Sequence, residues 1–133
     1  DVAATTTTVT GATDINGTLD IDNSGVFDAD GNFDANTGTI EMNGTARLQL
    51  SIAGSGVSSL GTLDGSAGTV EYDGGTQDVL AGTYYNLEID QAGTKTAQGA
   101  VNVNGLNPSA TKVPQEEPEY TVIHALEGVI SNV

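Results

Sequence analysis

Short runs of alternating apolar residues, separated by turns that contain glycine, dominate residues 68–105. Apolar side chains recur there mostly at every second position, which is the period of a strand with one buried face. Glycine supplies turn conformations that other residues resist. The segment therefore predicts one full winding of a β structure. Its apolar runs are Val70 and Tyr72; Val79 and Leu80; Tyr85, Leu87 and Ile89; and Val101 and Val103.

A signature made of an apolar residue, Asn or Asp, and glycine recurs along the chain. Its glycines are Gly17, Gly44, Gly74 and Gly105, which are separated by 27, 30 and 31 residues. The stretch 38–44 also matches 68–74 at a constant offset of 30. Self-similarity at such a period is typical of a solenoid.

We therefore expect an all-β fold, a short parallel β-helix of about three windings that spans residues 12–105. Alternation and turn residues do not by themselves distinguish parallel from antiparallel pairing. A β-sandwich or jelly roll built from the same strands is the alternative.

Four motifs follow one another in the most regular stretch: GTVEYDGGTQDV, GTYYNLEI, GTKT and VNVNG. They resemble the repeats of large secreted and cell-surface proteins of bacteria and archaea. The resemblance implies a right-handed parallel β-helix with a structural or adhesive role rather than a catalytic one. The matching residues are Gly68, Thr69, Val70, Tyr72, Asp73, Gly74, Gln77 and Val79; those at 82–87 and Ile89; Gly93, Lys95 and Thr96; and Val101, Val103, Asn104 and Gly105.

The ends of so short a solenoid need partners. Three windings at a strand spacing of about 4.8 Å stand only about 15 Å tall, and each buries its inner face only against its neighbours. The sequence predicts an extended, threonine-rich N-terminal arm at 1–11, a Pro/Glu linker at 106–119 and a strand-forming tail at 120–133. The tail could cover one end of its own solenoid or add strands to the next subunit.

An assembly interface is expected in the arm and in the tail, because both favour extended structure. Its predicted residues are Val2, Thr6, Thr8 and Val9 in the arm, and Tyr120, Val122, Ile123, His124, Leu126, Val129 and Ile130 in the tail.

The charge of the chain limits its partners. Eighteen acidic residues against three basic ones give a net charge of −15, which disfavours nucleic acids and anionic membranes. There is no cysteine, and no apolar run approaches the roughly 20 residues of a membrane span. The start at Asp1 and the Gly, Thr and Asn bias favour a secreted protein whose signal peptide has been removed.

The sequence offers little material for catalysis. Arg47, Lys95 and Lys112 are the only basic residues, and His124 is the only histidine, in the predicted tail strand. General acid and base chemistry would need acids clustered with such groups. We therefore expect no enzyme activity.

A weak calcium signal lies in residues 28–34, where oxygen-bearing side chains recur at every second position. Calcium takes six to eight oxygen ligands, and such a segment supplies several of them. The predicted ligands are Asp28, Asp30, Asn32 and Asp34. The alternative is a strand whose acidic side chains simply face solvent, and no other cofactor is expected.

Asn16 and Asn43 both match the N-glycosylation pattern, although Asn-Gly is also a favoured turn pair. Together with Asp73 and Asn104 they could instead form a ladder at equivalent turns. Tyr84 and Tyr85 are neighbours on a predicted strand, so one ring should point inward and the other outward.

These observations together predict a structural subunit of an extracellular or cell-surface filament. Its partner would be itself, in a head-to-tail homopolymer formed by strand addition between subunits. The alternative is an adhesin or a carbohydrate-binding module of a larger surface protein, with surface glycans as possible partners.

Overall fold

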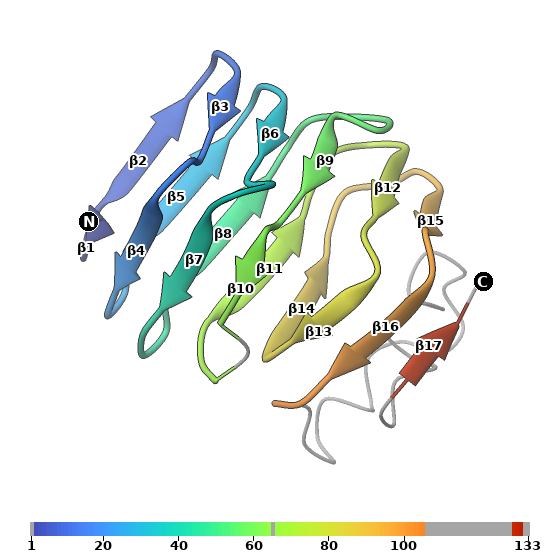
Figure 1. Ribbon diagram of the computed structural model, residues 1–133. Coiled ribbons are helices and arrows are strands. Elements are labelled where there is room, and N and C mark those ends of the chain that lie inside the picture. The colour runs from blue at the N-terminus through green and yellow to red at the C-terminus, as the bar shows by residue number, and fades with distance from the viewer. Residues whose placement is uncertain (1, 65, 106–128, 132–133) are drawn as a thin grey trace.

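The fold is an all-β, parallel β-solenoid of about five turns (Figure 1). The computed structural model describes residues 2–64, 66–105 and 129–131, and for Ala3 and 129–131 it describes the backbone alone. Each complete turn contributes one strand to each of three sides. Within the described residues every strand pairing is parallel except the last. This pairing confirms the predicted solenoid and decides against a sandwich.

The strands fall into three stacked sides. The first side contains β1 (Val2–Ala3), β4 (Thr18–Asp22), β7 (Thr39–Met42) and β10 (Thr62–Leu63). The second contains β2 (Thr6–Val9), β5 (Val26–Ala29), β8 (Arg47–Leu50), β11 (Thr69–Tyr72) and β14 (Asn86–Ile89). The third contains β3 (Thr13–Asp14), β6 (Phe33–Asp34) and β9 (Val57–Ser59), followed by the separate pair β12 (Gln77–Val79) and β15 (Lys95–Ala97).

A separate sheet completes the first side beyond β10. It consists of β13 (Gly82–Tyr84), β16 (Ala100–Val103) and β17 (Val129–Ser131), and β17 runs antiparallel to β16. No described pairing joins β10 to β13, and a small hollow of about 170 Å³ lies between them. The first side is therefore interrupted between the fourth and fifth turns.

The core is a set of stacked rows of inward side chains. On the second side Phe27 pairs with Leu48, Leu48 with Val70, and Val70 with Leu87, and all four side chains are buried. The residues that alternate with these four along each strand face outward, which is the pattern of a strand with one buried face. Phe27 and Phe33 meet edge to face with ring centroids 6.4 Å apart. On the second side the apolar row thus continues from the second turn to the fifth.

The prediction of about three windings is wrong, because one turn takes about 20 residues rather than 30. Residues joined by side-chain hydrogen bonds between adjacent turns are typically 20 to 22 positions apart. The two matching heptapeptides, 38–44 and 68–74, lie on different sides, in β7 and β11. They share a local pattern, a glycine corner followed by an alternating strand, without being stacked on each other.

The predicted ladder of turn residues is also wrong. Asn43 donates to Asp22 of the preceding turn at 2.9 Å, whereas Asp73 accepts from Ser51 at 2.7 Å on another side. Asn16 instead accepts from Thr37 at 3.0 Å. Asn16, Asn43 and Asp73 therefore lie at three different corners of the solenoid.

The segment predicted as an N-terminal arm forms part of the first turn. Its strands β1 and β2 are parallel neighbours of β4 and β5. The predicted boundary at Gly11 thus falls inside the solenoid. The predicted linker and most of the predicted tail, residues 106–128, lie outside the described residues.

Gly61 allows a close approach of two turns at a corner. Its φ is 56°, in the left-handed region that favours glycine, and an added Cβ would meet the carbonyl oxygens of Ala35 and Gly38. Both obstacles are backbone atoms, which cannot rotate away. The corner before β10 therefore requires glycine.

We predict that Gly61→Ala lowers the free energy of unfolding by about 2–3 kcal/mol, since it combines backbone strain with overpacking. Gly17→Ala is the matched control, because an added Cβ at Gly17 meets nothing within 4 Å. Urea unfolding of both variants, followed by circular dichroism, measures the difference. Equal stability of the two variants would contradict this account of the corner.

Candidate functional site

The first turn leaves one strand edge of the second side unpaired among the described residues. Val26 donates to the carbonyl oxygen of Thr5 at 2.8 Å, and Asp30 donates to that of Val9 at 2.9 Å. Backbone groups alternate between neighbours along a parallel ladder, so those of Thr6 and Thr8 point away from β5. Both residues are exposed. The outer edge of β2, which we call the N-terminal edge, thus presents free hydrogen-bonding groups.

The inward positions of the first turn carry more polar residues than those of the second turn. Thr7 pairs with Phe27, and Thr13 pairs with Phe33. Thr7 is exposed, while the Thr13 hydroxyl is buried and has no hydrogen-bond partner. The first turn therefore covers the aromatic core with a partly polar layer while its backbone edge stays open.

A strand has been added at the opposite end of the solenoid (Figure 1). Ala100 of β16 pairs with Ser131 of β17, and Val101 pairs with Ile130. This antiparallel strand contains Val129 and Ile130, two of the predicted interface residues.

The other predicted interface residues are spread between the core, the N-terminal edge and the undescribed part of the chain. Val2 is buried in the core, Val9 is half-buried, and Thr6 and Thr8 are exposed. Those outside the described residues are Tyr120, Val122, Ile123, His124 and Leu126.

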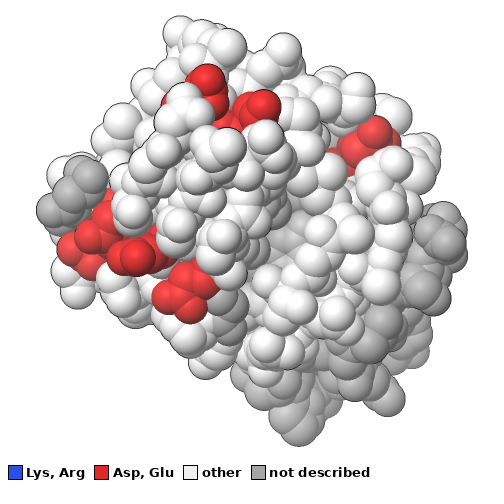
Figure 2. Space-filling model, in the orientation of Figure 1, with Lys and Arg blue, Asp and Glu red and all other residues white. Residues whose placement is uncertain are grey.

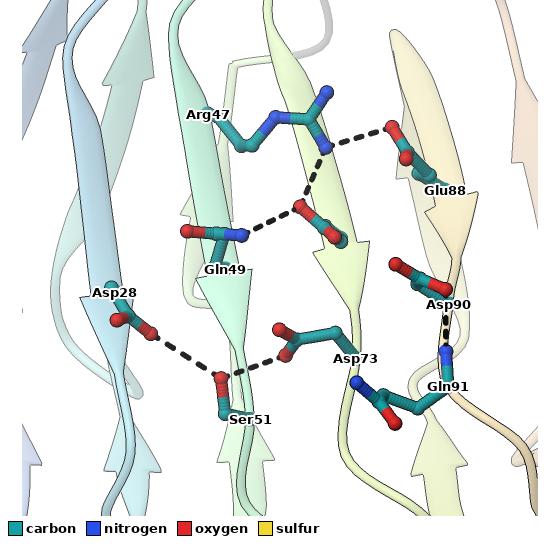
Figure 3. A network of polar contacts seen from close by, with 9 residues as sticks. Asp28, Arg47, Gln49, Ser51, Asp73, Glu88, Asp90 and Gln91 are labelled. Carbon is teal, nitrogen blue, oxygen red and sulfur yellow. Dashed lines mark hydrogen bonds and ion pairs between the residues drawn. The ribbon is translucent and has the colours of Figure 1, made fainter. Parts of the chain in front are cut away.

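A polar network crosses the outer surface of the second side (Figure 3). Arg47 forms ion pairs with Glu71 at 2.6 Å and with Glu88 at 2.7 Å, so it links three successive strands. Burial alone lowers the pKa of the Arg47 guanidinium, but hydrogen bonds and attraction from Glu88 and Glu71 outweigh it and raise that pKa. Because Arg47 and Glu88 are partly exposed, the pairs stabilise the stack only modestly.

The same surface continues with hydroxyl and carboxylate groups. The Ser51 hydroxyl lies 2.7 Å from Asp73 and 3.3 Å from Asp28, and Thr8 donates to Asp28 at 3.1 Å. Hydrogen bonds between side chains thus connect the first four turns. Figure 2, in the orientation of Figure 1, shows acidic side chains in patches on this face of the molecule, with no basic side chain visible among them.

The four predicted calcium ligands are not gathered at one point. Asp28 lies on the second side in the polar network, whereas Asp34 lies on the third side and accepts from the backbone N–H of Asn36 at 3.0 Å. Asp30 and Asn32 are exposed at the corner between them. In the part of the chain that the structure describes, no group of three or more Asp, Glu or His side chains is placed to hold a metal ion.

A groove crosses the third side over β3, β6 and β9. Its volume is about 330 Å³, and a register shift between β6 and β9 lies next to it. Such irregularities hollow a sheet and redirect its side chains. The polar residues that line the groove are Thr13, Asp14, Asn32, Asp34, Ser55 and Ser58.

Lys95 is buried at a corner, where its Nζ contacts four backbone carbonyl oxygens. These belong to Gly74 at 2.6 Å, Gly75 at 2.8 Å, Asp90 at 2.9 Å and Gln91 at 3.3 Å. Gln77 plays a similar part: its amide donates to the Leu50 carbonyl oxygen at 2.7 Å and accepts from Gly74 at 3.0 Å. Sequence reasoning missed both roles. The available signal was that Lys95 and Ala97 alternate with Thr96, which places Lys95 inward.

Tyr72 and Tyr84 form a buried hydrogen-bonded pair. The Tyr84 hydroxyl donates to the Leu80 carbonyl oxygen at 2.7 Å, the Leu80 N–H donates to Tyr72 at 3.3 Å, and the two hydroxyls lie 3.0 Å apart. Burial raises the pKa of Tyr72 to about 12, although its hydrogen bonds to Tyr84 and Leu80 lower it. Burial also raises the pKa of Tyr84 well above 10, and the neighbouring Tyr72 adds to that rise.

The predicted orientation of the two adjacent tyrosines is confirmed. Tyr84 is fully buried, while Tyr85 is 36% exposed. Asn16 and Asn43 are both exposed at corners, and glycosylation of these residues stays a prediction.

No protein-family model, curated protein or solved structure matches this chain. Within the described residues there is no helix long and apolar enough to cross a membrane.

We predict that stability falls steeply at alkaline pH because of the tyrosine pair. A raised folded-state pKa means that the neutral hydroxyls stabilise the fold fully below about pH 10, and this contribution is lost as the pH rises towards about 12. Urea unfolding between about pH 8 and 12 measures it, with a Tyr72→Phe/Tyr84→Phe double variant as the comparison.

The double variant should start less stable, by about 1–3 kcal/mol, because the backbone groups of Leu80 lose their partners. Its stability should then change less with pH than that of the unaltered protein. Parallel curves for the two proteins across this range would show that the pair does not control alkaline stability.

Proposed function

We propose that this chain is a structural subunit of an extracellular or cell-surface filament, in which copies join end to end by strand addition. The observation that carries the proposal is the open N-terminal edge, where the outward backbone groups of Thr6 and Thr8 are free to pair. An added strand gains main-chain hydrogen bonds along such an edge.

The opposite end of the solenoid supports the same mechanism. There β17 adds to β16, so an end of this stack already accepts an extra strand within the chain. A contact between two different ends of identical subunits does not close on itself unless rotation brings it round, and it then gives a filament.

The outer surface also suits a structural role. Arg47, Glu71 and Glu88 tie three successive strands together from outside the core, while stacked apolar rows hold them from inside. A repeat protein stabilised between nearest neighbours in this way extends naturally in one direction.

We predict that Thr6→Pro abolishes or shortens the filaments, because proline removes the outward N–H of the edge while leaving the ladder to β5 intact. Thr6→Val keeps this N–H and is the matched control. Negative-stain electron microscopy and light scattering at high protein concentration provide the readout, and circular dichroism verifies that both variants fold.

Two outcomes would overturn the filament proposal. The first is an unaltered protein that stays monomeric at high concentration. The second is a Thr6→Pro variant that assembles as well as the Thr6→Val control.

The groove on the third side favours a second candidate, an adhesin or carbohydrate-binding module of a larger surface protein. It offers carboxylates, an amide and hydroxyls, which are the groups that hydrogen-bond sugar hydroxyls. It lies away from the N-terminal edge of β2, so the two candidates predict different variants.

If the groove binds a glycan, Asp14→Asn should weaken binding about tenfold or more, as loss of a charge-assisted hydrogen bond predicts. Asp30→Asn alters an exposed acid that is not among the groove's lining residues and is the control. Screening a glycan array with monomeric protein, followed by titration of any glycan that binds, measures both. Equal weakening by the two substitutions would point to general charge effects, and no hit at all would remove this candidate.

A further inference from the structure

We propose that the segment Val129–Ser131 is the strand that joins the copies: it leaves β16 of its own chain and adds to the N-terminal edge of a second copy. This inference rests on the proposed function and names the donor and the acceptor. The strand would thus have two alternative sites, one within the chain and one between chains.

The position of β17 in the fold makes it the natural donor. It is a three-residue strand, and it is the only described strand that runs antiparallel to its neighbour. Every other described pairing in the stack is between turns that follow each other in sequence. Exchange of such a terminal element between identical copies requires little rearrangement of the rest of the fold.

The chain that precedes β17 is long enough to allow the transfer. Residues 106–128 separate β17 from the last described residue of the solenoid. At roughly 3.3 Å for each extended residue, this length spans tens of ångströms. A second copy stacked on the end of the solenoid lies well within that distance.

The donor and the acceptor also match in charge. Val129, Ile130 and Ser131 carry no ionisable side chain, and neither does any residue from Val2 to Thr13, which contains the whole of β2. In a chain of net charge −15, most other pairs of surfaces would bring carboxylates together. The neutral N-terminal edge therefore fits a neutral strand better than it fits the acidic outer surfaces.

Release of β17 would also open the end that it covers. While β17 is paired, the outer edge of β16 is occupied and cannot continue its sheet into a neighbouring copy. Once the strand has moved, β16 offers a free edge again. Transfer of the strand and stacking of the solenoids would therefore favour each other.

Cysteine cross-linking tests this directly, because the chain contains no cysteine. A Ser131→Cys variant is mixed at high concentration with a Thr6→Cys or Thr8→Cys variant and oxidised mildly. Paired strands bring Cα atoms within the range that a disulfide spans. A mixture with Thr96→Cys, an exposed position on the third side, measures random collision, and an Ala100→Cys/Ser131→Cys variant reports the pairing within one chain.

We expect the Ser131→Cys variant to form a disulfide with the Thr6→Cys or Thr8→Cys variant at least tenfold more abundantly than with the Thr96→Cys variant. It should increase with concentration as the cross-link within the Ala100→Cys/Ser131→Cys variant decreases. Cross-linking that joins copies only through position 100, or no excess over the Thr96 control, would overturn the assignment. Filaments that still form in that case would leave the proposed function standing, whereas their absence would remove both.

Discussion

The parallel backbone ladder between successive turns is the interaction on which the rest of this structure depends. It places Phe27, Leu48, Val70 and Leu87 directly above one another and so creates the buried rows. Inward side chains of one turn also touch each other, as Phe27 and Phe33 do, but the backbone of each turn is paired only with the turns above and below. Stability therefore comes from contacts between neighbouring turns. The first and last turns have a neighbouring turn on one side only, so the ladder stabilises the ends of the stack least.

Where the ladder is interrupted, buried polar side chains replace it. The first side breaks between β10 and β13, close to the corner at Leu80. There the hydroxyls of Tyr72 and Tyr84 satisfy both the N–H and the carbonyl oxygen of Leu80. Lys95 similarly contacts carbonyl oxygens of Gly74 and Asp90, at the corners between the second and third sides. Each hydrogen bond contributes little net free energy, but leaving such backbone groups unpaired in the interior would cost about 1–3 kcal/mol each.

The sequence predicted the fold class well and the turn length badly, for one physical reason. The alternation of apolar residues and the glycines at corners reflect only the local geometry of a strand and its turn. Every strand of the solenoid shares these features, so they do not reveal which strands are stacked. Stacked partners such as Leu48 and Val70 need share only an inward direction, and the separation between paired residues of adjacent turns varies from 17 for Val70 and Leu87 to 25 for Asp34 and Ser59. The threonine-rich start was predicted to be extended, and it forms β1 and β2, whereas its role as an interface stays a prediction. Lys95 and Gln77 were not recognised as buried, because polar residues that satisfy a corner resemble surface residues in the sequence.

The composition of the first turn limits how strongly any strand can add there. Thr7 and Thr13 stand where the second turn has Phe27 and Phe33, so covering this end buries little additional apolar surface. Attraction must then come mainly from backbone hydrogen bonds, each worth about 0.5–1.5 kcal/mol net. A three-residue strand alone would bind weakly, but once two copies are already in contact the tether raises its local concentration at the neighbour to roughly millimolar. Repulsion between acidic sides opposes contacts between solenoids that lie side by side, but it does not oppose contacts at the neutral N-terminal edge. These charges therefore favour association along the solenoid axis.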